Sequence, residues 1–289
     1  MNNTVAISGT TGFLGRELSE FFRQSNHEVI PITRHDYMLS DDKLAEKING
    51  VGALFHLAGA TLMQKWTDKV KKKIYNSRVD TTRKLVQAIA KTTEKPDMFY
   101  SASAVGIYDI YEVHDEFSSN YGDDFLADVC QAWEKEALKL YGQFGIRLII
   151  GRMGVVLGRS GGAFPQISKA LKLGVGNKIG DGFQNFPYIH ISDFLSAMWY
   201  LWKKSSCTGV FNIVAPQLVS NYEFADELNN VSGKKVLLNP PLWALKSRFG
   251  EGVSMFTHGQ KVLPRRLKKE NFYFLYPDLS STLTELFKV

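Results

Sequence analysis

A glycine-rich turn near the start of the chain constrains the fold more than any other sequence feature. It reads Gly9-Thr10-Thr11-Gly12-Phe13-Leu14-Gly15 and separates a short apolar run from a stretch with helical spacing of apolar residues. In a strand–turn–helix context such glycines allow a tight turn, the approach of the backbone to a pyrophosphate, and close packing of the helix on the strand. The helix N-terminus then offers free N–H groups to phosphates. The turn predicts a dinucleotide-binding site formed by Gly9, Thr11, Gly12, Phe13, Leu14 and Gly15; the alternative is a purely structural turn.

Strand-like apolar runs alternate with helical patterns over about the first two hundred residues. We expect strands at residues 4–8, 28–33, 53–57, 97–101 and 146–151, and helices at residues 13–25, 67–91 and 125–144. This alternation is typical of a parallel sheet covered by helices on both faces. The sequence therefore predicts an α/β fold with a Rossmann-type, doubly wound parallel sheet.

The sequence pattern changes after residue 152. Frequent glycines there divide the chain into short elements (Gly158, Gly161, Gly162, Gly174, Gly176, Gly180 and Gly182). We expect residues 1–160 to form the dinucleotide-binding Rossmann domain, with strands near 187–191 and 209–215 returning to its sheet. A helix capped at Ser192 is expected after the first of these strands. Residues 161–289 are expected to form a smaller substrate lobe with a mainly helical C-terminal module.

Composition and charge exclude several classes of protein. The chain of 289 residues is 44% hydrophobic and 22% charged, as in ordinary soluble globular proteins. It has no apolar stretch of the ~18 residues that a membrane span needs, and no signal-peptide pattern, so we expect a cytoplasmic protein without a membrane partner. The net charge of +6 comes without a nucleic-acid motif, so no nucleic-acid partner is expected. Cys130 and Cys207 lack the spacing of a metal site or a disulfide framework.

The end of the second expected strand bears on which dinucleotide is bound. An NAD site usually has Asp or Glu about 20 residues after the turn, where the carboxylate accepts hydrogen bonds from ribose hydroxyls. Here the strand ends Ile32-Thr33-Arg34, and a cation at this point suits the 2′-phosphate of NADP. We predict NADP as the cofactor. Arg34 as an ordinary surface arginine is the alternative, and Asp36 lies close enough that NAD is not excluded.

Many separate motifs occur in the order found in a known superfamily. With the glycine turn, Phe55-His-Leu-Ala-Gly-Ala60, Ser101-Ala-Ser-Ala104 and Tyr188-Ile-His-Ile-Ser-Asp193, the chain resembles the extended short-chain dehydrogenases/reductases over nearly all of its length. Further segments resemble the atypical epimerase-like branch, whose C-terminal module is of unknown function (Ser77-Arg78-Val79, Trp133-Glu134, residues 151–158, 260–264 and 274–279). The resemblance implies a nicotinamide cofactor, commonly NADP, in a family whose other members modify nucleotide sugars. The strand end implies cofactor contacts from Leu57, Ala58 and Gly59.

The usual catalytic pair of that superfamily is missing. Standard members carry Tyr-x-x-x-Lys on a helix, and the lysine lowers the pKa of the phenol so that tyrosine exchanges a proton while hydride moves. The corresponding positions of this chain hold Leu126 and Cys130, neither of which can replace the pair. A literal Tyr200-x-x-x-Lys204 lies on a later helix, and we interpret it as a coincidental surface pattern.

Ser103 and Tyr108 are the remaining candidate catalytic residues. Ser103 is placed to hydrogen-bond a substrate hydroxyl or carbonyl, and Tyr108 to donate a proton; the alternatives are a serine that satisfies backbone groups and an aromatic side chain that packs the loop. Cys130 is interpreted as an inert buried thiol rather than a nucleophile.

Two functions stay open at this point. The first is an oxidoreductase or epimerase that acts on an unknown small carbonyl, hydroxyl or sugar-nucleotide substrate. The second is a non-catalytic protein that senses NADP(H). In either case a homodimer is expected, because the helices at 67–91 and 125–144 correspond to those that pair between subunits in many extended members.

Overall fold

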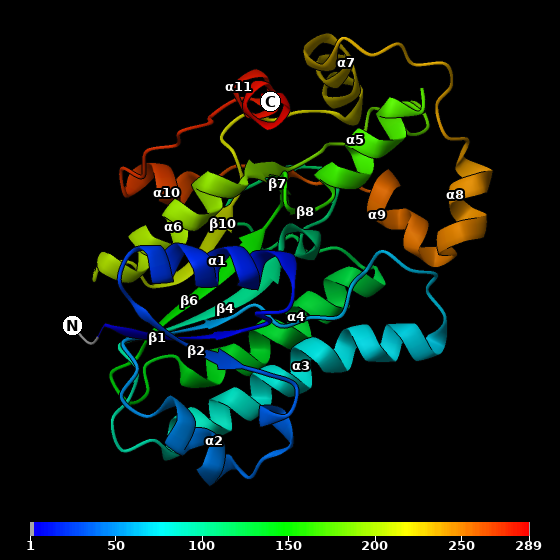
Figure 1. The fold of residues 1–289 in the computed structure, drawn as a ribbon. Helices are drawn as coiled ribbons and strands as arrows, with labels where there is room; N and C mark the ends of the chain where they lie inside the picture. Colours follow the sequence, from blue (N-terminus) through cyan, green and yellow to red (C-terminus); the bar gives the residue numbers. More distant parts are fainter. Residues whose placement is uncertain (1–2, 289) are drawn as a thin grey trace.

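A central sheet of six parallel strands organises the computed structural model, which describes residues 3–288 (Figure 1). The strand order is β10-β6-β4-β3-β1-β2. The strands are β1 (Thr4–Ser8), β2 (Glu28–Ile32), β3 (Ala53–His56), β4 (Met98–Ala104), β6 (Arg147–Met153) and β10 (Gly209–Ile213).

Helices cover both faces of this sheet, as Figure 1 shows. On one face lie α1 (Phe13–Gln24) and α6 (Ile191–Lys203), and on the other lie α2 (Asp41–Ile48), α3 (Asp68–Lys91) and α4 (Phe125–Ala137). Successive side chains of a strand point to opposite faces. Accordingly, Val5 and Ile7 of β1 join the core beneath α1 and α6, whereas Ala6 joins the core beneath α2 and α3. The predicted doubly wound α/β fold is confirmed.

The remaining elements lie beside this sandwich. A small sheet has the order β8-β7-β9, formed by β7 (Val155–Gly158), β8 (Gly161–Gly162) and β9 (Tyr188–His190). The helices are α5 (Phe164–Lys172), α7 (Asn221–Ser232), α8 (Leu242–Phe249), α9 (Ser254–Thr257), α10 (Arg265–Lys269) and α11 (Leu279–Phe287). Short 3-10 turns lie at Asp36–Met38, Val105–Ile107, Leu138–Leu140 and Glu251–Val253. None of the helices within residues 3–288 is long and apolar enough to cross a membrane.

The C-terminal module reaches back to the loop that follows β4. Its strand β11 (Lys261–Val262) pairs in parallel with β5 (Val113–His114) of that loop. Just beyond, the carboxylate of Glu116 accepts hydrogen bonds from the backbone N–H of Arg266, at the start of α10, and from that of Asn212 in β10. The loop and the module are therefore joined by strand pairing, and the Glu116 carboxylate joins both of them to the edge of the central sheet.

The expected return of two strands to the central sheet is half right. β10 pairs with β6 in that sheet, but β9 pairs with β7 instead. At Gly154 the chain after β6 crosses close to the residue before β9, since a Cβ there would lie 2.6 Å from the Pro187 carbonyl oxygen. A strand of only three residues is too short for its side-chain pattern to show which sheet it joins, so periodicity could not make this distinction. The boundary at residue 160 stays a prediction.

Two helix ends also differ from the sequence prediction. α6 is capped by His190 and not by Ser192, because the His190 Nδ1 accepts the Ser192 N–H at 3.1 Å. α4 ends at Ala137 rather than residue 144. The chain beyond it carries Gly142 and Gly145 at positive φ, a backbone conformation that ends helices. The homodimer expected through α3 and α4 stays a prediction.

Arg147, the first residue of β6, holds the end of α6 against the sheet. Its Nη1 donates to the backbone oxygens of Leu201, Lys204 and Cys207 at 3.1 to 3.2 Å, and its Nη2 donates to that of Trp202 at 2.7 Å. The last carbonyls of a helix have no partner within the helix and carry its negative dipole end. One guanidinium therefore satisfies the C-terminus of α6.

We expect Arg147→Met to lower the free energy of unfolding by about 2–3 kcal/mol, because several charge-assisted hydrogen bonds are lost together. Urea unfolding followed by circular dichroism measures this loss. The control is Arg159→Met, whose side chain is 47% exposed in its pair with Glu285 and should cost less than about 1 kcal/mol. Equal losses in the two variants would contradict the role assigned to Arg147.

Candidate functional site

The strand order reverses between β1 and β3. From β1 the chain passes through α1 to β2 on one side, and it then crosses back to place β3 on the other side of β1. The loops that follow β1 and β3 diverge at this point and leave a crevice between them. In doubly wound sheets, ligands bind in such a crevice at the carboxyl ends of the strands. The two loops are the glycine turn and residues 57–67, so the structure brings the two predicted halves of the cofactor site together.

Glycine is required at both ends of the turn. Gly9 has a φ of +77°, and a Cβ there would lie 2.9 Å from the carbonyl group of Leu57. A Cβ on Gly15 would lie 2.2 Å from the Gly9 oxygen. Between them, Gly12 is the exposed N-cap of α1, and no side chain caps this helix end. The first N–H groups of α1 thus remain available to an anion beside the exposed Thr11.

Phe13 serves packing through its side chain. A Cβ on Gly158 or Gly161, in the β7–β8 hairpin, would lie 2.7 or 2.6 Å from atoms of the Phe13 ring. The adjacent Leu14 is partly buried against the same core as α1 and α6. Any contact of these two residues with a cofactor would therefore come from their backbone. Some of the glycines expected to shape a substrate lobe instead make room for this ring.

Ser8, the last residue of β1, ties the two strand ends together. Its Oγ accepts the N–H groups of Leu57 and Ala58 at 3.1 and 3.2 Å, and it lies 2.7 Å from the His56 Nδ1. Since the hydroxyl accepts from two amides, its own proton is donated to Nδ1, and the proton of a neutral ring is on Nε2. That nitrogen lies 3.3 Å from Thr81 Oγ1, which donates to a carbonyl of its own helix.

His56 is kept neutral by its surroundings. The side chain has no exposed surface. Burial first, and then the positive charge of Arg78, lower the pKa of His56 to about 3. The Ser8–His56 hydrogen bond thus keeps one direction over the physiological pH range, and it holds residues 57–59 at the floor of the crevice.

Arg34 and Asp36 have different surroundings at the end of β2. Arg34 is exposed, and no other described residue forms a hydrogen bond or ion pair with its guanidinium. Asp36 is only 5% exposed. Its carboxylate accepts from the N–H and hydroxyl of Thr33 at 2.6 and 2.8 Å, and from Lys47 at 2.7 Å. Burial opposes ionisation, but Lys47 and Thr33 outweigh it and lower the pKa of Asp36. This carboxylate is used within the protein and is not free for ribose hydroxyls.

The helix that carries the catalytic pair in standard members is α4. Leu126, Cys130 and Glu134 are spaced four residues apart and share one face of it. Cys130 is 4% exposed and lies against Ser103 at the end of β4. Burial, followed by the charge of Glu134, raises the pKa of Cys130 to about 12. The group at the lysine position is therefore a neutral thiol.

Ser103 and Tyr108 are brought together by a buried arginine. The Nε and Nη2 of Arg152 donate to the two carboxylate oxygens of Glu134 at 2.8 Å, and the Ser103 hydroxyl donates to the same carboxylate at 2.6 Å. The Nη1 of Arg152 donates to the Tyr108 hydroxyl at 2.8 Å. With Asn212, which pairs with Tyr108 at 2.9 Å, these residues form the Arg152 cluster (Ser103, Tyr108, Glu134, Arg152 and Asn212).

The Arg152 cluster uses both candidate hydroxyls internally. Tyr108 is 1% exposed, and besides accepting from Arg152 it donates to Asn212 or to the Asp115 carbonyl oxygen. Burial, partly offset by Arg152, raises the pKa of Tyr108 to about 12. Ser103 has no exposed surface. A substrate would reach either hydroxyl only after the cluster opened, and the catalytic role of both residues stays a prediction.

Tyr200 of α6 and Lys204, the residue that follows this helix, join it to the C-terminal module. The Lys204 ammonium donates to the Tyr200 hydroxyl at 2.9 Å, and both groups donate to the backbone oxygen of Glu270. Earlier in α6, the Asp193 carboxylate accepts the N–H groups of Leu275 and Tyr276. Neither set of contacts involves the glycine turn.

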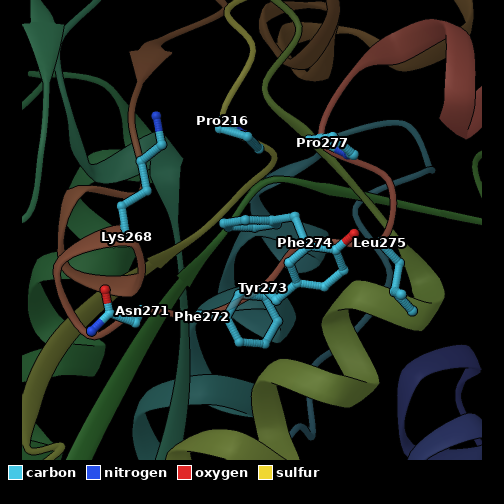
Figure 2. Close-up of a pocket in the computed structure, with 8 residues that line it drawn as sticks. All are labelled: Pro216, Lys268, Asn271, Phe272, Tyr273, Phe274, Leu275 and Pro277. Carbon is cyan, nitrogen blue, oxygen red and sulfur yellow. The ribbon is translucent and has the colours of Figure 1, made fainter.

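A surface hollow beside these contacts lies between Pro216, which follows β10, and the C-terminal module. Figure 2 shows three aromatic side chains gathered between Pro216 and Pro277; the hollow is lined by Pro216, Lys268, Asn271, Phe272, Tyr273, Phe274, Leu275 and Pro277. Phe272 packs against Tyr200 with ring centroids 5.4 Å apart. None of the residues predicted for the cofactor or for catalysis lines this hollow.

Sequence reasoning assigned no role to several polar residues that hold the site. Ser8, His56 and Arg152 interrupt or end apolar strands, and Glu134 is buried in a helix. A polar residue within an apolar run is a usable signal, because burial requires it to find a partner. The sequence of the strand does not show which residue this polar side chain pairs with.

The chain matches two family models. The NAD dependent epimerase/dehydratase family matches residues 5–213, and a domain of unknown function, DUF1731, matches residues 240–286. Among curated proteins, it is 32% identical to the epimerase family protein SSP1921 of Staphylococcus saprophyticus, over 97% of this chain and 98% of that protein. It is 34% identical to the chloroplastic epimerase family protein SDR39U1 homolog of Arabidopsis thaliana, over 97% of this chain and 85% of that one.

Two solved structures are similar in both fold and sequence. The human epimerase family protein SDR39U1 (isoform 2), solved with NADPH, has a TM-score of 0.89 and 31% identity, over 98% of both chains. A nucleoside-diphosphate sugar epimerase from Corynebacterium glutamicum has a TM-score of 0.79 and 29% identity, over 98% of this chain and 57% of the other.

The neutrality of His56 gives a testable pH dependence. The unfolded chain protonates this histidine below its ordinary pKa of 6.5, whereas the folded chain resists protonation down to a pKa of about 3. Because the unfolded state binds more protons in this window, stability is full above pH 6.5 and falls as the pH is lowered toward 3. We expect this group to cost about 1.4 kcal/mol per pH unit.

Urea unfolding of the wild type and of His56→Gln at pH 7.5, 6.0 and 5.0 measures this effect. The variant lacks the titrating group, so its stability should fall less steeply between these pH values, whatever its starting stability. Parallel pH dependences in the two proteins would contradict the assigned neutral state of His56.

Proposed function

We propose that this chain, which belongs to the NAD dependent epimerase/dehydratase family, binds NADP(H) in the crevice between β1 and β3. The observation that carries the choice of cofactor is the contrast at the end of β2. There Arg34 is an exposed cation with no partner among the described residues, while Asp36 is buried and already hydrogen-bonded. The human relative solved with NADPH supports the same choice.

The residues present fit a dinucleotide along the whole crevice. The tight glycines at positions 9 and 15 leave no room for side chains beneath a pyrophosphate, and the uncapped N-terminus of α1 attracts its charge. A 2′-phosphate dianion pairs with the planar fork of Arg34. An NAD ribose would need a free carboxylate at this place, and the carboxylate nearest in sequence is already paired with Lys47.

We propose that the protein is an oxidoreductase or epimerase of the cytoplasm that acts on a small carbonyl or hydroxyl compound or on a nucleotide sugar. Bound NADP(H) would supply or accept hydride. The nucleotide-sugar class is supported by the similarity to the epimerase from Corynebacterium glutamicum. For proton exchange the chain offers Ser103 and Tyr108, which would have to be released from the Arg152 cluster when substrate binds.

A second candidate function is a non-catalytic protein that binds NADP(H) and reports its level. Leu126 and the neutral thiol of Cys130 favour it, since they stand where the acid–base pair would be. The burial of Ser103 and Tyr108 favours it as well. The two functions share the cofactor site and differ only in turnover.

Arg34→Ala tests the choice of cofactor. Loss of a charge-assisted contact to the 2′-phosphate should weaken NADPH binding about 10–100-fold and leave NADH binding unchanged. Calorimetric titration of both cofactors measures this, with Arg23→Ala, an exposed arginine of α1, as the matched control. Equal affinity of the wild type for NADPH and NADH would refute the role of Arg34.

Turnover separates the two candidate functions. For an enzyme, we expect NADPH oxidation over a panel of aldehydes, ketones and keto-sugar nucleotides to fall about 100-fold or more in Ser103→Ala and Tyr108→Phe, with calorimetric NADPH affinity retained. If activity is indifferent to both changes, the catalytic assignments are wrong. Protection against heat by NADPH without any turnover would instead support the sensor.

A further inference from the structure

Arg78 of α3 is a cation at the crevice without a carboxylate partner. Its Nη1 donates to the backbone oxygens of Ala60 and Ile74, both at 3.2 Å. Within residues 3–288 no hydrogen bond or ion pair is formed by its Nε or Nη2. The guanidinium also lies over the Trp133 ring, 5.5 Å from its centroid. Three of its five N–H protons, one on Nε and two on Nη2, thus lack a protein acceptor, because the two acceptors serve the two protons of Nη1.

Arg78 lies between the two walls of the crevice. On the β3 side, a Cβ on Gly59 would lie 3.1 Å from the Arg78 Cζ and 3.2 Å from its Nη2, so glycine leaves room for the guanidinium. On the α4 side, its charge acts on Cys130. Burial lowers the pKa of Arg78, an effect that Cys130 partly offsets, and a guanidinium stays protonated in either case. The charge therefore stands next to the position that the lysine occupies in standard members.

Arg78 is a partly buried cation, and the donors that the protein leaves unpaired need oxygen acceptors. Removing a guanidinium from water is costly unless its donors are hydrogen-bonded, and two backbone oxygens serve only Nη1. A ligand with hydroxyl or phosphate oxygens would satisfy the other donors. The ligand already argued for this edge is the dinucleotide.

The order of the strands indicates which half of the dinucleotide Arg78 meets. Arg34 follows β2, the glycine turn follows β1, and Arg78 lies beyond β3, between Gly59 and the end of β4. A dinucleotide with its 2′-phosphate at Arg34 and its pyrophosphate at the turn extends its nicotinamide half toward β3 and β4.

We propose that Arg78 binds the nicotinamide half of NADP(H), with Nε and Nη2 donating to the oxygens of its ribose and adjoining phosphate. It replaces, from α3, the cation that standard members supply from α4 and that Cys130 cannot supply here. This inference rests on the proposed binding of NADP(H).

The test compares NADPH with adenosine 2′,5′-bisphosphate, which lacks the nicotinamide half, by calorimetric titration. Arg78→Met should weaken NADPH binding about 10–100-fold and leave binding of the bisphosphate unchanged. Arg78→Lys keeps a charge without the planar fork and should give an intermediate NADPH affinity. The matched control is Arg83→Met, on the same helix but paired with Asp80 and Glu136, which should change neither affinity.

Each outcome decides for or against Arg78. Wild-type NADPH affinity in Arg78→Met overturns the inference while leaving the result for Arg34 intact. An equal loss for both ligands overturns it as well, because the residue would then support the crevice as a whole. If Arg78→Met does not fold, Arg78→Lys decides by the same comparison. A wild type that binds neither ligand would refute the NADP(H) proposal itself.

Discussion

The hydroxyl of Ser8 is the contact on which the crevice depends. Strand order reverses between β1 and β3, so the backbone diverges there, and one side chain bridges the two ends by accepting two amides and donating to His56. Beside this bridge Gly9 lies so close to Leu57 that a Cβ would be 2.9 Å from its carbonyl group. Because His56 stays neutral, the bridge needs no counter-charge, and the nearby cations remain available to a ligand.

The charges around the crevice fall into two groups. One group is satisfied within the protein, as in the bidentate Arg152–Glu134 pair and the Lys47–Asp36 pair. Such buried pairs add little net stability, but they fix geometry, and breaking one leaves a costly unpaired charge. The other group, Arg34 and Arg78, lacks carboxylate partners among the residues described. The cations proposed to bind NADP(H) are therefore free to do so. The Ser103 and Tyr108 hydroxyls, which would exchange a proton with a substrate, are instead bonded to the Arg152–Glu134 pair.

Local patterns predicted the fold well, and the details of pairing less well. The glycine turn and the alternation of strands and helices depend on neighbours within a few residues, and both are confirmed. By contrast, β9 joins the small sheet where the chain before it passes close to Gly154, a residue more than thirty positions earlier in the sequence. In the site, the sequence favoured Arg34 as the cofactor ligand but left Asp36 open as an alternative, and only the structure shows that Lys47 and Thr33 use this carboxylate. The surroundings of Ser103 and Tyr108 depend on Arg152 and Asn212, contributed by later strands, which no local pattern reveals.

The pairing of β5 with β11 bears on how the chain is made. Residues 113–114 leave the ribosome long before residues 261–262, and Glu116 likewise waits for the N–H of Arg266. During synthesis N-terminal regions generally fold first, and contacts distant in sequence form late. The half of the crevice proposed to hold the dinucleotide phosphates can thus assemble early. The loop that carries Tyr108 is completed only when the end of the chain arrives, so in a nascent chain the proposed cofactor half can form before the loop proposed for the substrate is complete.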